Sequence, residues 1–398
     1  FDPSLPANAV YVFRSMVTAL DSYALLAIPL FILSGNIMAK GGISRKLFDF
    51  FSYFIGNKTA GLPIAAIITC LFYGAISGSG PATVAAVGSM TIPLLVELGY
   101  DKKFVVAMIA VAGGLGVIIP PSIPFIVYGQ SSGASVGDLF IAGVLPGVLI
   151  AMCMIIYAYA YCKLKGEDKE KLLANTKALR SRGFMTMFKD SFWALLTPVI
   201  ILGGIYSGIV TPTEAANISV IYALVVSILI YKSLKIKDLS TVMKETVNTA
   251  APILLVVSIA TVFGKVLTFM QAPRLISGVI TGAFSSKISI LLVINLILLF
   301  VGMVMDTTPA ILILTPIFMP IIQSIGVNPL HFGIIMVVNL AIGFVTPPIG
   351  INLFVASSLT GISVMDIAKR AVPFIIAFLI ALMLITFIPQ ISLLLVGK

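Results

Sequence analysis

Two short polar segments interrupt long apolar runs, and they hold the residues best suited to bind ions. The segments read SGSGP at residues 77–81 and DTTP at residues 306–309. Each offers a hydroxyl that can cap a helix. In the first segment Ser79 is the cap and Pro81 the first helical residue, and in the second Thr307 or Thr308 is the cap and Pro309 lies in the first turn. Free N–H groups at two such helix starts suit the carboxylate of a substrate. The candidate substrate contacts at these starts are Ser79, Pro81 and Thr308.

Asp306 is the only acid between residues 246 and 365. A carboxylate within an apolar segment is a functional hypothesis by default, because its burial must be compensated by a partner. If the segment were a turn at the membrane surface, Asp306 would instead be a simple helix cap. We therefore expect a functional carboxylate, with the cap as the alternative.

Proline pairs break two other apolar segments and expose backbone carbonyls there. The segments read GVIIPPSIPFIVYG at 116–129 and GFVTPPIGINLFV at 343–355, and a regular helix cannot continue through either. Carbonyls and hydroxyls, with one carboxylate, suit a hard monovalent cation such as Na⁺ better than a transition metal. The amides of Gln130 and Asn352 follow the two breaks and are further candidate substrate contacts.

The composition indicates a polytopic membrane protein. Of the 398 residues, 59% are hydrophobic and 10% are charged, and the mean hydropathy is +1.14, which excludes an ordinary soluble domain. Apolar windows long enough to cross a bilayer recur without any alternating strand pattern, so the fold class is all-α. The net charge of +10 comes from basic residues beside these windows, which favours membrane orientation over nucleic-acid binding. We find no nucleophile with a paired base and no cysteine spacing for a metal, so an enzyme is disfavoured.

The lengths of the apolar runs, and the proline, glycine and polar residues between them, divide the chain into spans, hairpins and broken helices. Two pairs of apolar arms, at 61–98 and 287–325, are predicted as re-entrant helical hairpins. Arms of about 17 residues reach ~25 Å, so a hairpin that crosses twice and turns at the surface is the alternative. The predicted single spans are 21–39, 140–162, 192–209, 213–231, 251–270 and 373–396.

The same plan occurs twice along the chain. Pro309 minus Pro81 is 228 and Pro347 minus Pro120 is 227, so hairpin tips and breaks recur at a nearly constant offset. An odd number of crossings separates the two copies, which makes them inverted repeats. The hairpin bases of the first repeat carry most of the basic residues and are predicted to face the cytoplasm. Inverted repeats with broken helices are typical of a secondary transporter that binds its substrate near the midplane.

Four segments in this order resemble the large membrane subunit of the tripartite ATP-independent periplasmic (TRAP) transporters. They are SGSGPATVAAVGSMTIP, GVIIPPSIPFIVYG, MDTTPAILILTPIFMPI and GFVTPPIGINLFV, and the resemblance covers essentially the whole chain. The family has one further helix before FDPSLP, so we expect a missing preceding segment or a fused small subunit. The resemblance implies an elevator-type, Na⁺-driven importer of an organic acid such as a C4-dicarboxylate or sialic acid, in the bacterial inner membrane. It also implies two protein partners, a small membrane subunit and an extracytoplasmic solute-binding protein.

The resemblance further implies where Na⁺ binds and which parts move. Each ion lies where a hairpin tip meets the nearby broken helix. The first set is Ser79, Gly80, Gly116, Pro120 and Ser122, and the second is Asp306, Thr307, Gly343, Thr346 and Pro347. The transport halves are 61–135 and 287–360, and the scaffold comprises 1–60, which includes an interfacial arm, 136–286 and 361–398. A stand-alone Na⁺/dicarboxylate or citrate symporter is the nearest alternative, and an ion channel is the next.

Overall fold

A computed structural model describes residues 9–284 and 286–397, and throughout these residues the regular structure is helical, with no strand. Nine helical segments within them are long and apolar enough to cross a membrane. The predicted all-α membrane fold is therefore confirmed. The predicted departure from the family at Phe1–Pro6 lies outside the described residues.

The first repeat begins with the apolar helix α2 (Ala27–Lys40), followed by the amphipathic helix α3 (Ile43–Ile55). Hairpin 1 then consists of α4 (Gly61–Ser77) and α5 (Gly80–Glu97). Its arms are joined by only two residues, because Gly78 adopts a left-handed backbone conformation (φ 62°) and closes the turn. The predicted position of the tip is confirmed.

Broken helix 1 consists of α6 (Lys102–Ala112), the short 3₁₀ segment η2 (Gly113–Val117) and α7 (Ile123–Ser132). The helix stops where prolines remove backbone donors, and it restarts at Ser122, whose hydroxyl accepts a hydrogen bond from the Phe125 N–H group. A cis peptide bond joins Pro120 and Pro121.

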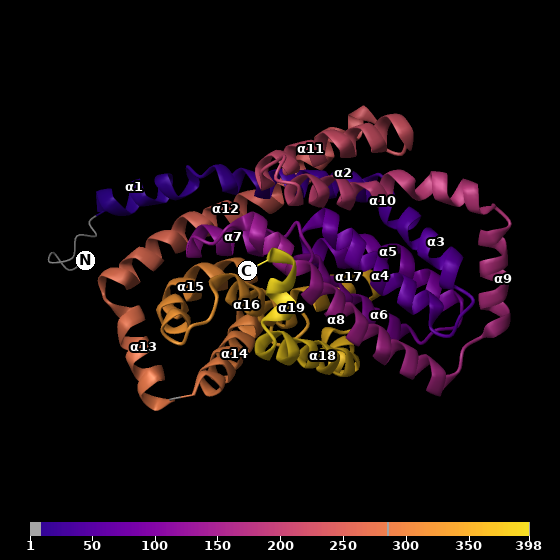
Figure 1. The fold of residues 1–398 in the computed structure, drawn as a ribbon. Helices are drawn as coiled ribbons and strands as arrows, with labels where there is room; N and C mark the ends of the chain where they lie inside the picture. The colour runs from indigo at the N-terminus through magenta and orange to yellow at the C-terminus, as the bar shows by residue number, and fades with distance from the viewer. Residues whose placement is uncertain (1–8, 285, 398) are drawn as a thin grey trace.

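The second repeat follows the same order. A long helix, α12 (Leu239–Phe269), leads to the amphipathic α13 (Ala272–Ala283). Hairpin 2 then consists of α14 (Lys287–Val304) and α15 (Thr307–Ser324). In Figure 1, hairpin 1 follows α3 from one end of the molecule and hairpin 2 follows α13 from the opposite end, as expected for inverted repeats.

Broken helix 2 consists of α16 (Pro329–Gly343) and α17 (Ile351–Thr360). A cis peptide bond joins Pro347 and Pro348 in its break. The last span is α18 (Val364–Phe387), so the predicted span at 373–396 is wrong at both ends. Ser363 caps the helix earlier, and Pro389 follows its end.

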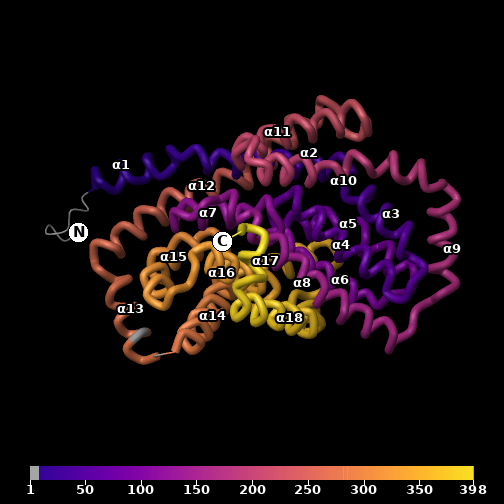
Figure 2. The backbone as a smooth tube through the Cα atoms, viewed as in Figure 1, coloured from indigo at the N-terminus to yellow at the C-terminus, as the bar shows by residue number. Residues whose placement is uncertain are grey.

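Four helices connect the repeats. The first, α8 (Val136–Lys165), leads into the hydrophilic α9 (Lys169–Arg180), which runs along one end of the molecule in Figure 2. The chain then returns through α10 (Phe184–Tyr206) and α11 (Pro212–Leu224). The remaining short elements are α1 (Ala9–Leu20), η1 (Tyr23–Leu26), η3 (Val225–Ile230), η4 (Ile236–Asp238), α19 (Gln390–Leu393) and η5 (Leu394–Val396).

The helices pack in two groups. One group consists of α1, α2, α10, α11 and α12, which line the upper side of the molecule in Figure 1. The other contains both hairpins and both broken helices, and α8 and α18 pack within it against α4, α6 and α16. We call the first group the scaffold body and the second the hairpin body. The packing favours counting α8 and α18 with the hairpin body, whereas the predicted boundaries at 136 and 361 assign them to the scaffold.

Candidate functional site

Hairpin 1 gathers oxygen atoms at its tip. The Thr83 hydroxyl donates a hydrogen bond to the Ser79 carbonyl oxygen at 2.8 Å. The Ser77 hydroxyl lies 3.1 Å from the Thr83 hydroxyl and 3.3 Å from the same carbonyl oxygen. Ser77 and Thr83 are both buried. We call this group, Ser77 Oγ, the Ser79 carbonyl oxygen and Thr83 Oγ1, the tip 1 oxygen cluster.

The Ser79 side chain caps α5, as predicted. Its hydroxyl accepts a hydrogen bond from the Ala82 N–H group at 3.5 Å. The sequence predicted Pro81 as the first residue of the helix. This is wrong by one position, because the helix begins at Gly80 and Pro81 is its second residue. Since the proline lacks an N–H group, it costs the first turn no hydrogen bond.

Broken helix 1 contacts the tip 1 oxygen cluster through Gly116. A Cβ atom on Gly116 would lie 2.4 Å from Thr83 Oγ1 and 2.7 Å from the Ser79 carbonyl oxygen. Only a residue without a side chain allows this approach. The predicted meeting of Ser79 and Gly116 is therefore present in the structure.

The other residues predicted for the first cation set lie in or beside the same break. The Ser122 hydroxyl donates to the Val117 carbonyl at 2.5 Å, which holds the two ends of the break together. A Cβ atom on Gly78 would lie 2.9 Å from the Pro121 carbonyl oxygen, so this proline faces the tip. Pro120 is buried beside it. Hydroxyls and carbonyls of this kind are the ligands that hard cations prefer.

At hairpin 2 the carboxylate itself caps the helix. Asp306 Oδ1 accepts a hydrogen bond from the Thr307 N–H group at 2.7 Å and lies 3.4 Å from the Thr307 hydroxyl. The prediction that Thr307 or Thr308 caps α15 is wrong, because the helix already begins at Thr307. Both threonines are buried, and Asp306 is half-buried.

The end of α14 meets broken helix 2 one turn before Asp306. A Cβ atom on Gly343 would lie 2.1 Å from the Gly302 carbonyl oxygen, so the two backbones touch. The Ile349 N–H group donates to the Met303 carbonyl at 3.1 Å. The tip and the break are thus adjacent, as predicted for the second cation set.

The side chains predicted for the second cation set do not form a cluster of oxygen atoms like that at tip 1. The Thr346 hydroxyl, in the break, donates to the Ile342 carbonyl at the end of α16 at 2.8 Å, and Pro347 is partly exposed. Among the described hydrogen bonds, those of the Asp306 carboxylate go to Thr307 and not to Gly343, Thr346 or Pro347. A cation here would draw on backbone carbonyls of the break together with the free oxygen of the carboxylate.

Asn352 connects the two repeats. It is fully buried, and its Nδ2 donates to the Ala110 carbonyl in broken helix 1 at 2.9 Å. Its Oδ1 has no hydrogen-bond partner among the described residues and would lie 3.3 Å from a Cβ atom on Gly80. Asn352, a candidate substrate contact from the second repeat, therefore lies at the tip of hairpin 1.

Gln130 lies elsewhere. Its Oε1 accepts a hydrogen bond from the Ser22 hydroxyl at 2.9 Å, at the junction between the scaffold and hairpin bodies. The structure does not bring it to either tip. Sequence reasoning missed Ser77 and Thr83. Thr83 lies four residues after Ser79, a helical spacing that places the two residues on the same face and could have revealed it.

Comparisons with known proteins identify the family. The family model described as "Tripartite ATP-independent periplasmic transporter, DctM component" matches residues 5–391. The "Isethionate TRAP transporter permease protein DctMQ" of Oleidesulfovibrio alaskensis is 45% identical over 394 residues. That match covers 99% of this chain and 61% of the relative, so this chain spans less than two thirds of that protein.

Two further relatives match most of both chains. The "C4-dicarboxylate TRAP transporter large permease protein DctM" of Pseudomonas aeruginosa is 41% identical, covering 94% of this chain and 86% of the relative. The "Sialic acid TRAP transporter large permease protein SiaM" of Vibrio cholerae is 35% identical, covering 96% and 88%.

One solved structure supports the fold alone. The crystal structure of the Alcanivorax borkumensis YdaH transporter aligns with a TM-score of 0.64 at 16% identity, covering 95% of this chain and 88% of that one. The predicted inner-membrane location and the predicted family are confirmed. This chain belongs to the DctM family, the large permease subunits of the tripartite ATP-independent periplasmic transporters.

Proposed function

We propose that this large permease subunit imports a small organic anion and couples its entry to Na⁺. The observation that carries the proposal is the tip 1 oxygen cluster in contact with Gly116. Hydroxyl and carbonyl oxygens provide neutral ligands of the kind that hold a hard monovalent cation. The N-termini of α5 and α15 supply N–H groups that favour a carboxylate or sulfonate nearby.

Na⁺ at the tips links ion binding to substrate binding. A cation held by the Ser79 carbonyl would order the turn whose next residues begin α5, so the N–H groups that face the anion would be fixed at the same time. At hairpin 2 the Asp306 carboxylate would supply a negative charge for a second ion. The substrate would thus bind most tightly to the Na⁺-loaded form.

The hairpin body is the part proposed to move. It contains both tips, both breaks, α8 and α18, and it would slide against the scaffold body in an elevator motion. A small membrane subunit and an extracytoplasmic binding protein are the proposed partners. The relatives' names, which include isethionate, C4-dicarboxylates and sialic acid, indicate the substrate class to test.

Uptake into proteoliposomes tests this function. The chain, reconstituted with its small subunit and a cognate binding protein, is supplied with labelled isethionate, succinate or sialic acid. We expect uptake of one of them when an inward Na⁺ gradient is present and little when K⁺ replaces Na⁺. Equal uptake in both salts would refute Na⁺ coupling. Uptake without the binding protein would instead support a stand-alone symporter.

A further inference from the structure

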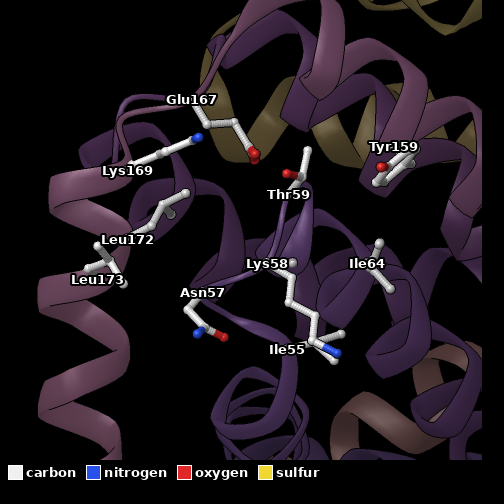
Figure 3. A pocket seen from close by; sticks show the side chains of 11 residues that line it. Ile55, Asn57, Lys58, Thr59, Ile64, Tyr159, Glu167, Lys169, Leu172 and Leu173 are labelled. Atoms are coloured by element: carbon white, nitrogen blue, oxygen red, sulfur yellow. The ribbon is translucent and has the colours of Figure 1, made fainter.

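A cavity of about 590 Å³ lies at the predicted cytoplasmic end, away from both tips. It is open on one side and is lined by the end of α3, the start of α4, the last turns of α8 and the helix α9. Figure 3 shows Lys58 and Asn57 on one side of Thr59, and Glu167 and Lys169 on the other. The apolar lining residues lie on two sides of the cavity, with Leu172 and Leu173 on one side and Ile55 and Ile64 on the other (Figure 3).

Two lysines that line the cavity have no ion-pair partner among the described residues. Neither Lys58 nor Lys169 lies within ion-pair distance of a carboxylate among the described residues. The one acid in the wall, Glu167, is already engaged. Its two oxygens each accept a hydrogen bond from the Ala60 N–H group at 3.0 Å, and one also accepts from the Tyr100 hydroxyl at 2.6 Å. Two ammonium groups without a carboxylate partner among the described residues therefore line the cavity, one on each side of it (Figure 3).

An apolar strip leads from the cavity along α8. Tyr159 lines the cavity and is 45% exposed. Ile156 and Met152 follow on the same helical face and are 65% and 54% exposed. Since α8 is one of the candidate membrane spans, this strip runs from the charged cavity toward the bilayer interior.

We propose that this cavity binds the phosphate headgroup of an anionic phospholipid, with an acyl chain lying along the α8 strip. Phosphatidylglycerol, whose phosphate carries one negative charge, is the lipid used to test the proposal. The basic residues at this end orient it toward the cytoplasmic leaflet, and basic pockets between transmembrane helices on that side favour anionic headgroups. A free phosphate compound would use the lysines alone, whereas a lipid also uses the strip.

Native mass spectrometry of the purified complex tests the proposal. Phosphatidylglycerol or phosphatidylcholine is added in detergent, and the lipid retained on the protein is measured. We expect retention of phosphatidylglycerol only. The double variant Lys58→Gln/Lys169→Gln should lower its retention about tenfold or more, since each lysine near an anionic headgroup strengthens binding severalfold.

The matched control is Lys163→Gln/Lys177→Gln, which removes the same charge from exposed lysines of α8 and α9 outside the cavity. It should retain phosphatidylglycerol as the unmodified chain does. Equal loss in both double variants, or equal retention of the two lipids, would overturn the site. Inorganic phosphate and glycerol phosphate should leave the lipid bound. Displacement of the lipid by either would show a soluble phosphate site and overturn the lipid assignment.

Discussion

At the scale of single residues, Thr83 joins the tip of hairpin 1 to broken helix 1. Its hydroxyl bonds the Ser79 carbonyl and would touch any side chain placed on Gly116. A threonine hydroxyl can share one carbonyl oxygen with a cation and still offer its own lone pairs. On the proposed function, Thr83 would bind Na⁺ directly and its hydrogen bond to the Ser79 carbonyl would change when the ion binds.

Thr83→Val removes this hydroxyl and keeps the shape of the side chain. We expect the Na⁺ concentration for half-maximal uptake to rise on the order of tenfold, because an interaction with a charged group is lost. The control is Thr91→Val on the same helix, where the buried hydroxyl bonds the Val87 carbonyl of its own helix at 2.8 Å and has no other partner among the described residues. If Thr91→Val shifted the Na⁺ dependence equally, the specific role of Thr83 would be wrong.

Asp306→Asn separates the charge from the helix cap. Asparagine caps helices about as well as aspartate, so the hydrogen bond to the Thr307 N–H group should persist and the fold should be kept. We expect Na⁺-dependent uptake to fall on the order of tenfold or more, measured as initial rates at several Na⁺ concentrations. Unchanged uptake would show that Asp306 is a structural cap and not part of a cation site.

At the scale of elements, α3 and α9 form a clamped pair between the two bodies. The Arg180 guanidinium donates to the Tyr53 carbonyl at 3.1 Å and to Asn57 Oδ1 at 3.3 Å. A Cβ atom on Gly56 would lie 3.0 Å from the Thr176 hydroxyl, so the helices approach closely. Because both helices connect the scaffold body to the hairpin body, they are expected to move together.

Tyr100→Phe tests a hydrogen bond at the other end of α9, where the Tyr100 hydroxyl, between α5 and α6, donates to Glu167 just before α9 begins. Burial raises the pKa of Tyr100, and the hydrogen bond to Glu167 raises it further, so the phenol stays protonated at neutral pH. The variant should lower stability by about 1.5–3 kcal/mol, as expected for a hydrogen bond to a charged group. Thermal unfolding measures this change, with Tyr53→Phe on the arm as the control. Equal melting temperatures for both variants would contradict a stabilising role of the hydrogen bond between Tyr100 and Glu167.

The sequence predicted the order of the elements because prolines and glycines act locally. The predicted positions of all these elements are confirmed, namely the two hairpins, the two breaks and the amphipathic arms. Each position was predicted from the prolines, glycines and polar residues between the apolar runs. The boundaries of α12 and α18 were missed, since polar first turns and the Ser363 cap extend these helices beyond their apolar cores. The cap at Asp306 was predicted only as the alternative, and Thr307 or Thr308 was expected in its place. Threonine and aspartate both favour this position, and only the backbone geometry decides between them.

The candidate site was predicted in part. The approach of Gly116 to Ser79 followed from the family resemblance and is present. The reach of Asn352 from broken helix 2 to Gly80 could not be predicted, because it depends on how two distant repeats pack together. The hydrogen bonds of Glu167 were missed for the same reason, because its partners Ala60 and Tyr100 lie 107 and 67 residues away in the chain.

At the scale of the whole molecule, the proposed elevator requires the two bodies to slide past each other. A Cβ atom on Gly264 of α12 would lie 3.7 Å from the Pro316 ring of α15, so these positions are neighbours across the boundary. A disulfide between Gly264→Cys and Pro316→Cys, made after replacing the native cysteines, should stop uptake until reductant is added. Full uptake with the disulfide formed would contradict the sliding motion.

The matched control lies within the scaffold body. Asn36 Nδ2 donates to the Thr246 hydroxyl at 3.1 Å, joining α2 to α12. A disulfide between Asn36→Cys and Thr246→Cys should leave uptake intact, because in the proposed elevator α2 and α12 would stay fixed relative to each other. Loss of uptake in this pair would show that cross-linking itself is harmful.

Substrate-evoked Na⁺ entry tests the central claim most directly. Proteoliposomes with the chain, its small subunit and the binding protein receive radiolabelled Na⁺, and substrate is then added. We predict a burst of Na⁺ influx that accompanies substrate uptake. At a Na⁺ concentration that is half-maximal for the unmodified protein, the burst should be several times smaller in Thr83→Val and unchanged in Thr91→Val. Substrate uptake without any added Na⁺ influx in the unmodified protein would contradict Na⁺ coupling at the hairpin tips.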